Sequence, residues 1–456
     1  LTFDGTGSLA LGGAIGNSNR LNSLTVTSNL PSVTLNTSIS TSNNQTYNTA
    51  ILLSGNTSLT SASGFIIILN STVDGAHSLS LTSRANFLGG AVGSTTALSS
   101  LSLQGGGTDL IAANITTTGN QTYQDPIILE ASATWQTTGS GNIALGTVGA
   151  SSGVTWASGS NYTLNLNSAN HISLNAPIDG LSNGATGTLN LSAAYSAQSI
   201  TTANSTSGLQ ATTGGVIHVA IFNLLQGQWY QNTAANTLPN FTASDFRISS
   251  GAMPSSSAEF LRVTGGDGSS GNAYQITDVY GLQGIGSDAT LLSKKFELVN
   301  SVDASGTQNW NSGGGFIPIG SSVTPYSGVF IGSPNISQFH VISNLYINQS
   351  NSPTLTNSIG LFGYSTDAVE FVGLVNATIE VVNTADAGLV VGHSEGLISN
   401  VLSSGMISFS GNGNGRLGGI VGVMGANATI AQSYSTASVI ANPTGTAGLV
   451  TAGGLV

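Results

Sequence analysis

Two blocks of this sequence recur at nearly the same distance along the chain. The segment from Leu11 to Gly16 returns as Leu88 to Gly93 at an offset of 77, and Asn44 to Tyr47 returns as Asn120 to Tyr123 at an offset of 76. A shorter glycine-containing echo has an offset of 56. Such self-similarity is typical of folds in which a repeat buries its apolar residues only against neighbouring repeats. Because 76 is four times 19 and 56 is one short of three times 19, these offsets predict stacked coils of about 19 residues.

The composition indicates that the coils consist of short strands. Gly, Ser, Thr and Asn make up nearly half of the 456 residues, and these types disfavour helix. Apolar residues alternate with polar ones in short runs such as Leu79-Ser80-Leu81, which is typical of half-buried strands. A mean hydropathy of +0.21 favours a buried core over disorder. We therefore predict an all-β fold, a right-handed parallel β-helix (β-solenoid), with Gly and Asn at tight corners and Ser, Thr and Asn ladders between coils.

Charge and cysteine content restrict the classes of function. Only 5% of the residues are charged, with 7 Lys+Arg against 18 Asp+Glu and a net charge of -11. Such a surface offers no basic groove, so we expect no nucleic-acid or anionic-membrane binding. The chain contains no cysteine, which excludes disulfides, thiolate metal sites and cysteine nucleophiles and suits export in an unfolded state across a bacterial envelope. We expect an export signal to be removed or to lie outside this sequence.

The regular pattern loosens in the middle of the chain. From about residue 222 to 275 several aromatic residues accumulate, and burial is expected for them because their rings carry large apolar area. Asp278 is expected to cap a short helix that runs through Val279, Leu282 and Ile285. The aromatic side chains that could instead contact a ligand are Trp229, Tyr230, Tyr280 and Trp310.

A second repeat occupies the C-terminal part. Glycine-flanked apolar units begin at Gly360, Gly388, Gly418 and Gly453, at offsets between 28 and 35, and the last unit is expected to be interrupted. If these units are equivalent coil segments, Leu389 and Ile420 should point into the solenoid. The segment around Asn412, rich in glycine, is expected to be a solvent-facing corner.

These units resemble the GLUG repeats of large secreted bacterial adhesins. The segment from Ser301 to Leu345 is similar to the part that precedes such repeats, and the Asn-Gln-Thr-Tyr coils resemble passenger repeats of filamentous-haemagglutinin-like proteins. We therefore divide the chain into filamentous-haemagglutinin-like coils at 1–221, an embellished β segment at 222–350 and GLUG-type repeats at 351–456.

The resemblance implies an extracellular protein, secreted or on the bacterial outer surface. It implies export by two-partner secretion or a related route, through an outer-membrane transporter, and a role in cell adhesion or biofilm matrix. The partners it implies are glycans or proteins of host or neighbouring cells, a matrix polymer, and other copies of the chain in a filament. The receptor, the export route and glycosylation of the Asn-x-Ser/Thr sites stay open.

The alternative class is a polysaccharide-binding or polysaccharide-degrading β-helix enzyme, a lyase or a hydrolase. Such enzymes need positioned carboxylates, and lyases also need a basic residue. Acidic residues that could converge from neighbouring coils are Asp367, Glu370, Asp386 and Glu395. The seven basic residues are scattered, so we expect no enzyme and no catalytic residue.

No cofactor or metal site is expected from the sequence. The five histidines lie far apart along the chain, which disfavours a transition-metal site. Gly265-Gly266-Asp267-Gly268 resembles one unit of a calcium-binding array, and whether a single unit binds calcium weakly stays open.

Overall fold

The structure is a computed structural model of all 456 residues. The described residues are all except 148–149, 151–152, 195–198, 203–214, 234–236, 250–257, 335–338, 352–356, 383–384, 412 and 445–447. The chain forms two compact units. The N-terminal unit comprises the described residues of Leu1–Tyr230 and Pro239–Ala243, and the C-terminal unit comprises those of Gln231–Leu238, Ser244–Ala252 and Ala258–Val456. The three-part division made from the sequence stays a prediction.

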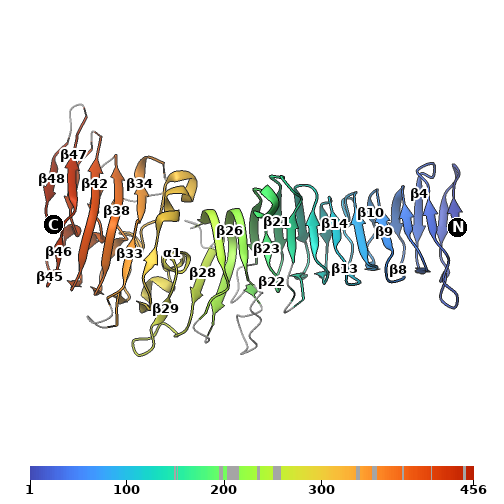
Figure 1. The fold of residues 1–456 in the computed structure, drawn as a ribbon, viewed down its shortest axis with the longest axis horizontal. Coiled ribbons are helices and arrows are strands. Elements are labelled where there is room, and N and C mark those ends of the chain that lie inside the picture. Colours follow the sequence, from blue (N-terminus) through green and yellow to red (C-terminus); the bar gives the residue numbers. More distant parts are fainter. Residues whose placement is uncertain are drawn as a thin grey trace. The chain divides into compact units, whose positions relative to one another are not determined.

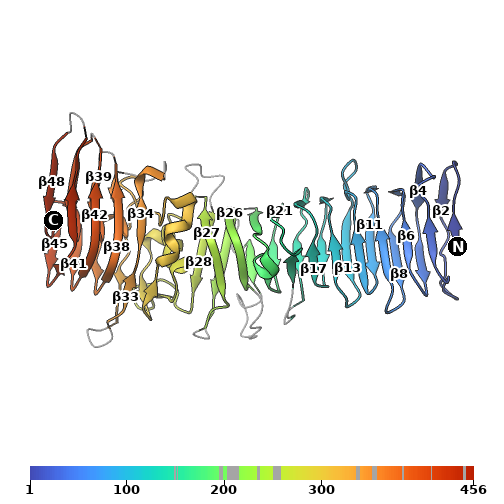
Figure 2. The ribbon, with the colours of Figure 1, turned by 45° about the horizontal axis from the view of Figure 1, so that its top comes forward.

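The N-terminal unit is a parallel β-helix with three faces, and successive strands visit the faces in a fixed cyclic order (Figures 1 and 2). Strands of the first face are β1 (Thr2–Phe3), β3 (Leu24–Val26), β6 (Gln45–Tyr47), β9 (Ile66–Leu69), β12 (Ala85–Leu88), β14 (Asp109–Ile111), β17 (Ile127–Leu129), β20 (Val154–Trp156) and β23 (Ile178–Asp179). Strands of the second face are β2 (Leu9–Leu11), β4 (Ser32–Leu35), β7 (Ala50–Leu53), β10 (Val73–Asp74), β15 (Ile115–Thr117), β18 (Ala133–Thr137), β21 (Thr163–Ser168) and β24 (Thr188–Ala193).

The third face completes each turn. Its strands are β5 (Ser38–Thr41), β8 (Thr57–Ser61), β11 (Ser78–Thr82), β13 (Ser100–Gln104), β16 (Gln121–Tyr123), β19 (Ile143–Leu145), β22 (Ile172–Leu174) and β25 (Ile200–Thr202). The long strand β26 (Ile217–Asn232) pairs in turn with β23, β24 and β25 and so crosses all three faces. A 3-10 turn, η1 (Ser182–Gly184), precedes β24. The predicted parallel β-solenoid is confirmed, while its right-handed sense stays a prediction that rests on the usual hand of parallel crossovers.

The coil length predicted from the sequence offsets is wrong for most coils. The register offset is only 18 where Ser32 pairs with Ala50, but 23 where Val92 pairs with Ile115. Later coils are longer, as the pairing of Ile178 with Ile217 shows. Between β6 and β16 the chain takes eleven steps from face to face, or three and two-thirds turns. The offset of 76 therefore corresponds to about 21 residues per turn, and the repeated motif returns on a different face.

The repeated Asn-Gln-Thr-Tyr motif can occur on different faces because the hydrogen bonds of its Gln and Tyr side chains are all made at a single corner of the β-helix. The Tyr47 hydroxyl donates to Gln45 Oε1 at 3.0 Å, and the Tyr123 hydroxyl donates to Gln121 Oε1 at 2.9 Å. Each glutamine Nε2 also donates to a backbone carbonyl inside the helix. Both pairs are fully buried, so the motif satisfies its polar groups wherever a corner of this shape occurs.

Outward positions carry the predicted side-chain ladders. On the second face, Asn223 Nδ2 donates to Asn190 Oδ1 at 2.6 Å, and Asn190 Nδ2 donates to Asn165 Oδ1 at 2.7 Å. Asn165 Nδ2 continues the ladder to Thr134 Oγ1 at 3.2 Å. In-register pairing sets these residues one above the other, since neighbouring strands lie about 4.8 Å apart. Inward positions alternate with them and hold the buried leucines, isoleucines and valines.

The C-terminal unit is also built of stacked parallel strands, in four columns (Figure 1). The first column contains β29 (Tyr274–Ile276), β30 (Phe296–Leu298), β32 (Phe330–Ile331), β37 (Val369–Glu370), β41 (Leu397–Ser399) and β45 (Thr429–Ala431). The second contains β31 (Val302–Asp303), β33 (Val341–Ser343), β34 (Tyr346–Asn348), β38 (Gly373–Val381), β42 (Leu402–Phe409), β46 (Tyr434–Ser435) and β47 (Ser438–Ala441).

The other two columns hold the glycine-flanked units. They contain β35 (Ser358–Ile359), β39 (Ala385–Gly388), β43 (Gly415–Gly418) and β48 (Val450–Gly453), and β36 (Phe362–Ser365), β40 (Val391–Ser394) and β44 (Val421–Met424). The remaining elements are β27 (Phe241–Ile248), β28 (Ala258–Val263), α1 (Val279–Gly284), η2 (Leu291–Ser293), η3 (Ser305–Gly313) and η4 (Gln349–Asn351). Helix α1 begins as predicted, because Asp278 Oδ1 accepts a hydrogen bond from Gly281 N at 2.8 Å.

The second repeat stacks as its glycines predict. Gly388 pairs with Gly418, and Gly418 with Gly453. An added Cβ at Gly388 would lie 2.3 Å from the carbonyl oxygen of Val391, so glycine is required for this close approach. Leu389 and Ile420 are both fully buried, which confirms the predicted orientation.

The strand register confirms that the units at Gly388 and Gly418 are equivalent coil segments. Val391 pairs with Val421, so Ile420 lies opposite Val390. Leu389, Val390 and Val391 are all fully buried, so this unit places three consecutive apolar residues inside rather than alternating ones. Asn412 lies outside the described residues.

A carboxylate at Leu389 should unfold its coil. Leu389→Asp would bury an unpaired charge at a fully enclosed position, and we expect a loss of more than about 4 kcal/mol of unfolding free energy. The control is Ala426→Asp in an exposed turn, which should change stability by less than about 0.5 kcal/mol. Urea unfolding followed by far-UV circular dichroism measures both, and equal midpoints for the two variants would contradict the burial of Leu389.

The asparagine ladder should contribute measurably to stability. Asn190→Ala removes one donor and one acceptor from the middle of the ladder, with an expected cost of about 1–2 kcal/mol. Asn17→Ala, at an exposed position, serves as the control and should be nearly silent. Thermal unfolding of the two variants measures the difference. An Asn190→Ala variant as stable as the parent chain would mean that water replaces the ladder hydrogen bonds with no loss of stability.

Candidate functional site

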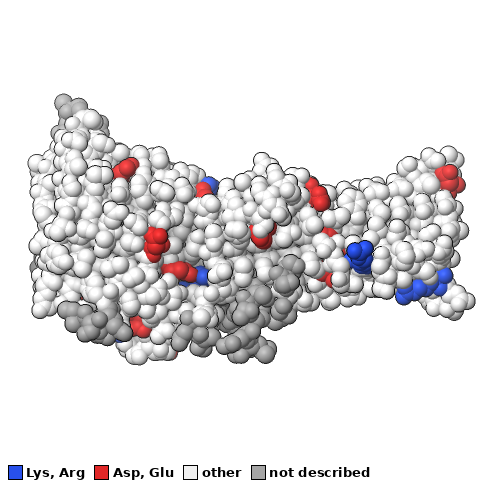
Figure 3. Space-filling view, in the orientation of Figure 1, with Lys and Arg blue, Asp and Glu red and all other residues white. Residues whose placement is uncertain are grey.

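Charged side chains are sparse on the face of the molecule seen in Figure 3. In the C-terminal unit, three charged side chains and one histidine gather on neighbouring coils: Asp386 in β39, His393 in β40, Glu395 after it, and Arg416 in β43. We call these four residues with Tyr364 the surface cluster. Asp386 pairs with Arg416 and Tyr364 with His393 in the strand register, so coil stacking brings the cluster together.

Close contacts occupy the polar groups of the surface cluster. Arg416 Nε donates to Asp386 Oδ1 at 2.7 Å, and a terminal guanidinium nitrogen donates to Oδ2 at 2.9 Å. His393 Nε2 lies 3.0 Å from Glu395 Oε1, and His393 Nδ1 lies 3.8 Å from Asp386 Oδ2. The Tyr364 and His393 rings stack with centroids 4.4 Å apart and planes inclined by 7°.

The electrostatics follow from these contacts. The hydrogen bond from His393 holds the pKa of Glu395 below its usual value, with help from the Tyr364 hydroxyl, which donates at 3.2 Å. Burial, followed by the hydrogen bond and charge of Glu395, raises the pKa of Tyr364. Both ring nitrogens of His393 thus face carboxylates. This arrangement clamps adjacent coils on their outer side and leaves the Arg416 side chain 57% exposed.

The structure brings together two of the four acidic residues that were considered from the sequence. Asp386 and Glu395 meet through His393. Glu370 instead accepts a hydrogen bond from the Ser399 hydroxyl at 2.7 Å, and Asp367 accepts one from Ala368 N at 2.8 Å. His393 and Arg416 were not predicted as their partners from the sequence. The signal was present, since Tyr364 and His393 each follow a glycine at equivalent positions of consecutive repeats.

The aromatic residues considered as ligand contacts divide into core and partly buried positions. Trp229 and Trp310 are fully buried, as packing predicted. Tyr280 stacks on Trp310 with ring centroids 5.2 Å apart, and Phe246 packs against both rings. Tyr230 is partly exposed.

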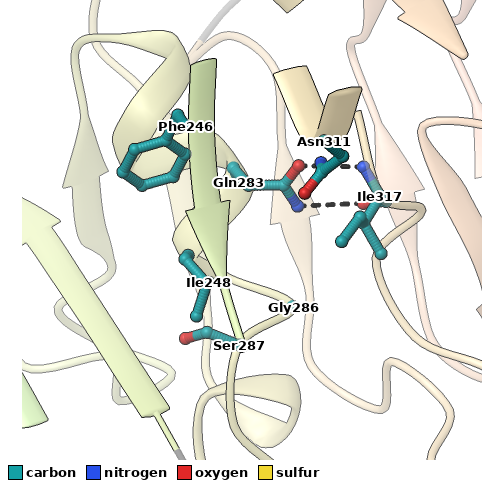
Figure 4. Close-up of a pocket in the computed structure, with 7 residues that line it drawn as sticks. All are labelled: Phe246, Ile248, Gln283, Gly286, Ser287, Asn311 and Ile317. Atoms are coloured by element: carbon teal, nitrogen blue, oxygen red, sulfur yellow. Dashed lines mark hydrogen bonds between the residues drawn. The ribbon is translucent and has the colours of Figure 1, made fainter. Parts of the chain in front are cut away.

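A small pocket lies beside this aromatic group (Figure 4). Its lining residues are Phe246, Ile248, Gln283, Gly286, Ser287, Asn311 and Ile317. The Gln283 side chain donates to Ile317 O at 3.0 Å and accepts from Ile317 N at 2.8 Å, so its amide is used to hold the wall of the pocket. The free space is too small to enclose a sugar ring, and the pocket serves packing better than binding.

Asp267 forms part of a turn. Its Oδ1 accepts a hydrogen bond from Ser269 N at 2.9 Å, and the hydroxyl and backbone of Ser269 together hold its pKa below the usual value. Within the described residues, no group of three or more His, Asp or Glu side chains could hold a metal ion.

Two acids that were not predicted from the sequence are buried in the N-terminal unit. Asp109 is fully buried and Asp125 is 5% exposed. Burial raises the pKa of Asp109 to about 7, with a further contribution from the charge of Asp125, and burial also raises the pKa of Asp125. Each carboxylate has one oxygen, Oδ2, that is enclosed and has no hydrogen-bond partner in the described structure. The two acids belong to successive coils, so no local motif marks them.

Among curated proteins, the chain is similar to halomucin from Haloquadratum walsbyi, with 36% identity over 165 residues. The match covers 35% of this chain and 2% of halomucin, so the chain spans a very small part of that relative. No family model and no solved structure matches the chain. In the described part of the chain, no helix has the length and apolar character needed to cross a membrane.

Proposed function

We propose that this chain is a non-enzymatic structural and adhesive segment of an extracellular surface protein. The observation that carries the proposal is the stack of parallel coils whose outward ladders consist of uncharged amides and hydroxyls. The similarity to halomucin, whose name describes a mucin, supports a location outside the cell. In this role the coils keep an attachment surface in a fixed arrangement, and their neutral exterior forms hydrogen bonds with a partner.

The chemistry of the exterior favours glycans or a hydrated matrix polymer as the partner. Rows of Asn, Thr and Gln side chains at the spacing of the coils offer donors and acceptors to sugar hydroxyls. Proteins on neighbouring cells and other copies of the chain are further partners in this proposal. We also propose export by two-partner secretion through an outer-membrane transporter, on the ground of the sequence resemblance to filamentous-haemagglutinin-like and GLUG proteins.

Attachment should depend little on salt. With only 5% charged residues, binding to an immobilised glycan panel should change less than about twofold between 0.15 M and 2 M NaCl, because screening acts on charges. Biolayer interferometry with the full chain measures this. A steep fall of affinity with salt, or the absence of binding to every glycan and matrix polymer in the panel, would contradict the proposal.

A polysaccharide-degrading enzyme is the second candidate, and the observation that favours it is the His393 ring between two carboxylates. We expect no release of reducing ends or unsaturated products from pectins, glycosaminoglycans and bacterial exopolysaccharides. Turnover that is lost in Glu395→Gln and Asp386→Asn, but retained in the control Glu370→Gln, would overturn the adhesive proposal. Binding without turnover by the unmodified chain supports it.

A further inference from the structure

The two buried acids of the N-terminal unit lie in one corner of the β-helix. Asp109 is the first residue of β14, and its backbone N donates to Pro126 O at 2.8 Å. Asp125 directly precedes Pro126 in the next coil. Asp109 Oδ1 accepts two hydrogen bonds, from Asn86 N at 2.7 Å and Asn86 Nδ2 at 2.9 Å. Asp125 Oδ1 accepts one from Gly106 N at 2.8 Å.

A glycine loop brings three coils together at this corner. At Gly105 an added Cβ would lie 1.8 Å from Ser83 O, and at Gly107 it would lie 1.4 Å from Arg84 O. Gly105 and Gly106 have φ values of 146° and 91°, which other residues rarely adopt. The loop therefore packs directly on the coil before it, while its Gly106 N reaches Asp125 in the coil after it.

Among the described residues, no ion pair joins Asp109 or Asp125 to a positive charge. The groups around the pair are the Tyr123 ring, the Asn86 amide and the backbone of the glycine loop. Arg84 is exposed, and no ion pair joins it to either acid in the described structure. Buried carboxylates are normally paired or bound to a metal ion, and an enclosed oxygen without a partner is costly.

We propose that Asp109 and Asp125 bind one calcium ion through their unpartnered Oδ2 atoms. Two carboxylates balance the charge of a divalent cation, and the two Oδ2 atoms are hard oxygen ligands of the kind that calcium prefers. Carbonyl groups of the loop Gly105 to Thr108 are the remaining ligands in this proposal. Calcium tolerates irregular coordination. Magnesium demands octahedral geometry and retains bound water, for which this packed corner leaves little room. The ion connects the two successive coils that contain β14 and β17.

The test uses the full chain freed of metal with EGTA. Thermal unfolding followed by circular dichroism is recorded with CaCl2, with MgCl2, and with NaCl at matched ionic strength. Calcium should raise the midpoint of the N-terminal unit by several degrees, and isothermal titration should give one tight site per chain. Magnesium and sodium should have much smaller effects. An equal response to magnesium would overturn the choice of calcium.

Variants separate this site from surface binding and from misfolding. Asp109→Asn and Asp125→Asn should both abolish the calcium-dependent shift. In EGTA, Asp109→Asn should unfold at the same temperature as the parent chain or higher, because it removes an unpaired buried charge. Asp4→Asn, which changes an exposed acid of the same unit, is the matched control and should keep the full calcium response.

The outcome also distinguishes calcium from a proton. If the two acids merely share a proton, added calcium will not change the unfolding temperature of the parent chain, and the proposal is overturned. A calcium response that persists in both Asn variants would assign the ion to another site and would equally overturn it.

Discussion

Backbone pairing between successive coils is the interaction on which this protein depends. Most strands of the N-terminal unit are very short, and such strands are not stable in isolation. Each one inside the stack hydrogen-bonds to the coil before it and to the coil after it, and its inward residues are buried between the two neighbours. Stability is therefore close to a sum of neighbour terms along the stack.

The same pairing accounts for the unusual composition. Parallel in-register strands set equivalent positions about 4.8 Å apart, so a charge repeated on successive coils would repel itself. Asparagine, serine and threonine stack without this cost and hydrogen-bond to one another, as Asn165, Asn190 and Asn223 do. Where Asp386 and Arg416 meet on adjacent coils, the two charges are opposite.

The sequence predicted the fold class, the capped helix at Asp278 and the stacking of the glycine-flanked units. It failed on coil length, because the Gln45 and Gln121 motifs were assumed to occupy the same face. A repeated motif marks corners of the same shape, but a three-faced β-helix has three corners in each turn. The distance between two copies of a motif therefore need not be a whole number of turns. Asp386 and Glu395 were foreseen as convergent, but their link through His393 required the register. Asp109 and Asp125 were not foreseen, since their proximity depends on how a glycine loop packs between coils.

The register of the three-faced stack is tested most directly by engineered disulfides, for which the absence of native cysteine is an advantage. Ser80 and Ser102 are register partners on β11 and β13, and their side chains face outward. Ser80→Cys with Ser102→Cys should oxidise readily to an intramolecular disulfide, because in-register Cα atoms lie within bonding range. Ser80→Cys with Ser99→Cys, the pair that a coil length equal to the sequence-derived value would align, should stay reduced. Cross-linking of the second pair in preference to the first would contradict the fold described for the N-terminal unit.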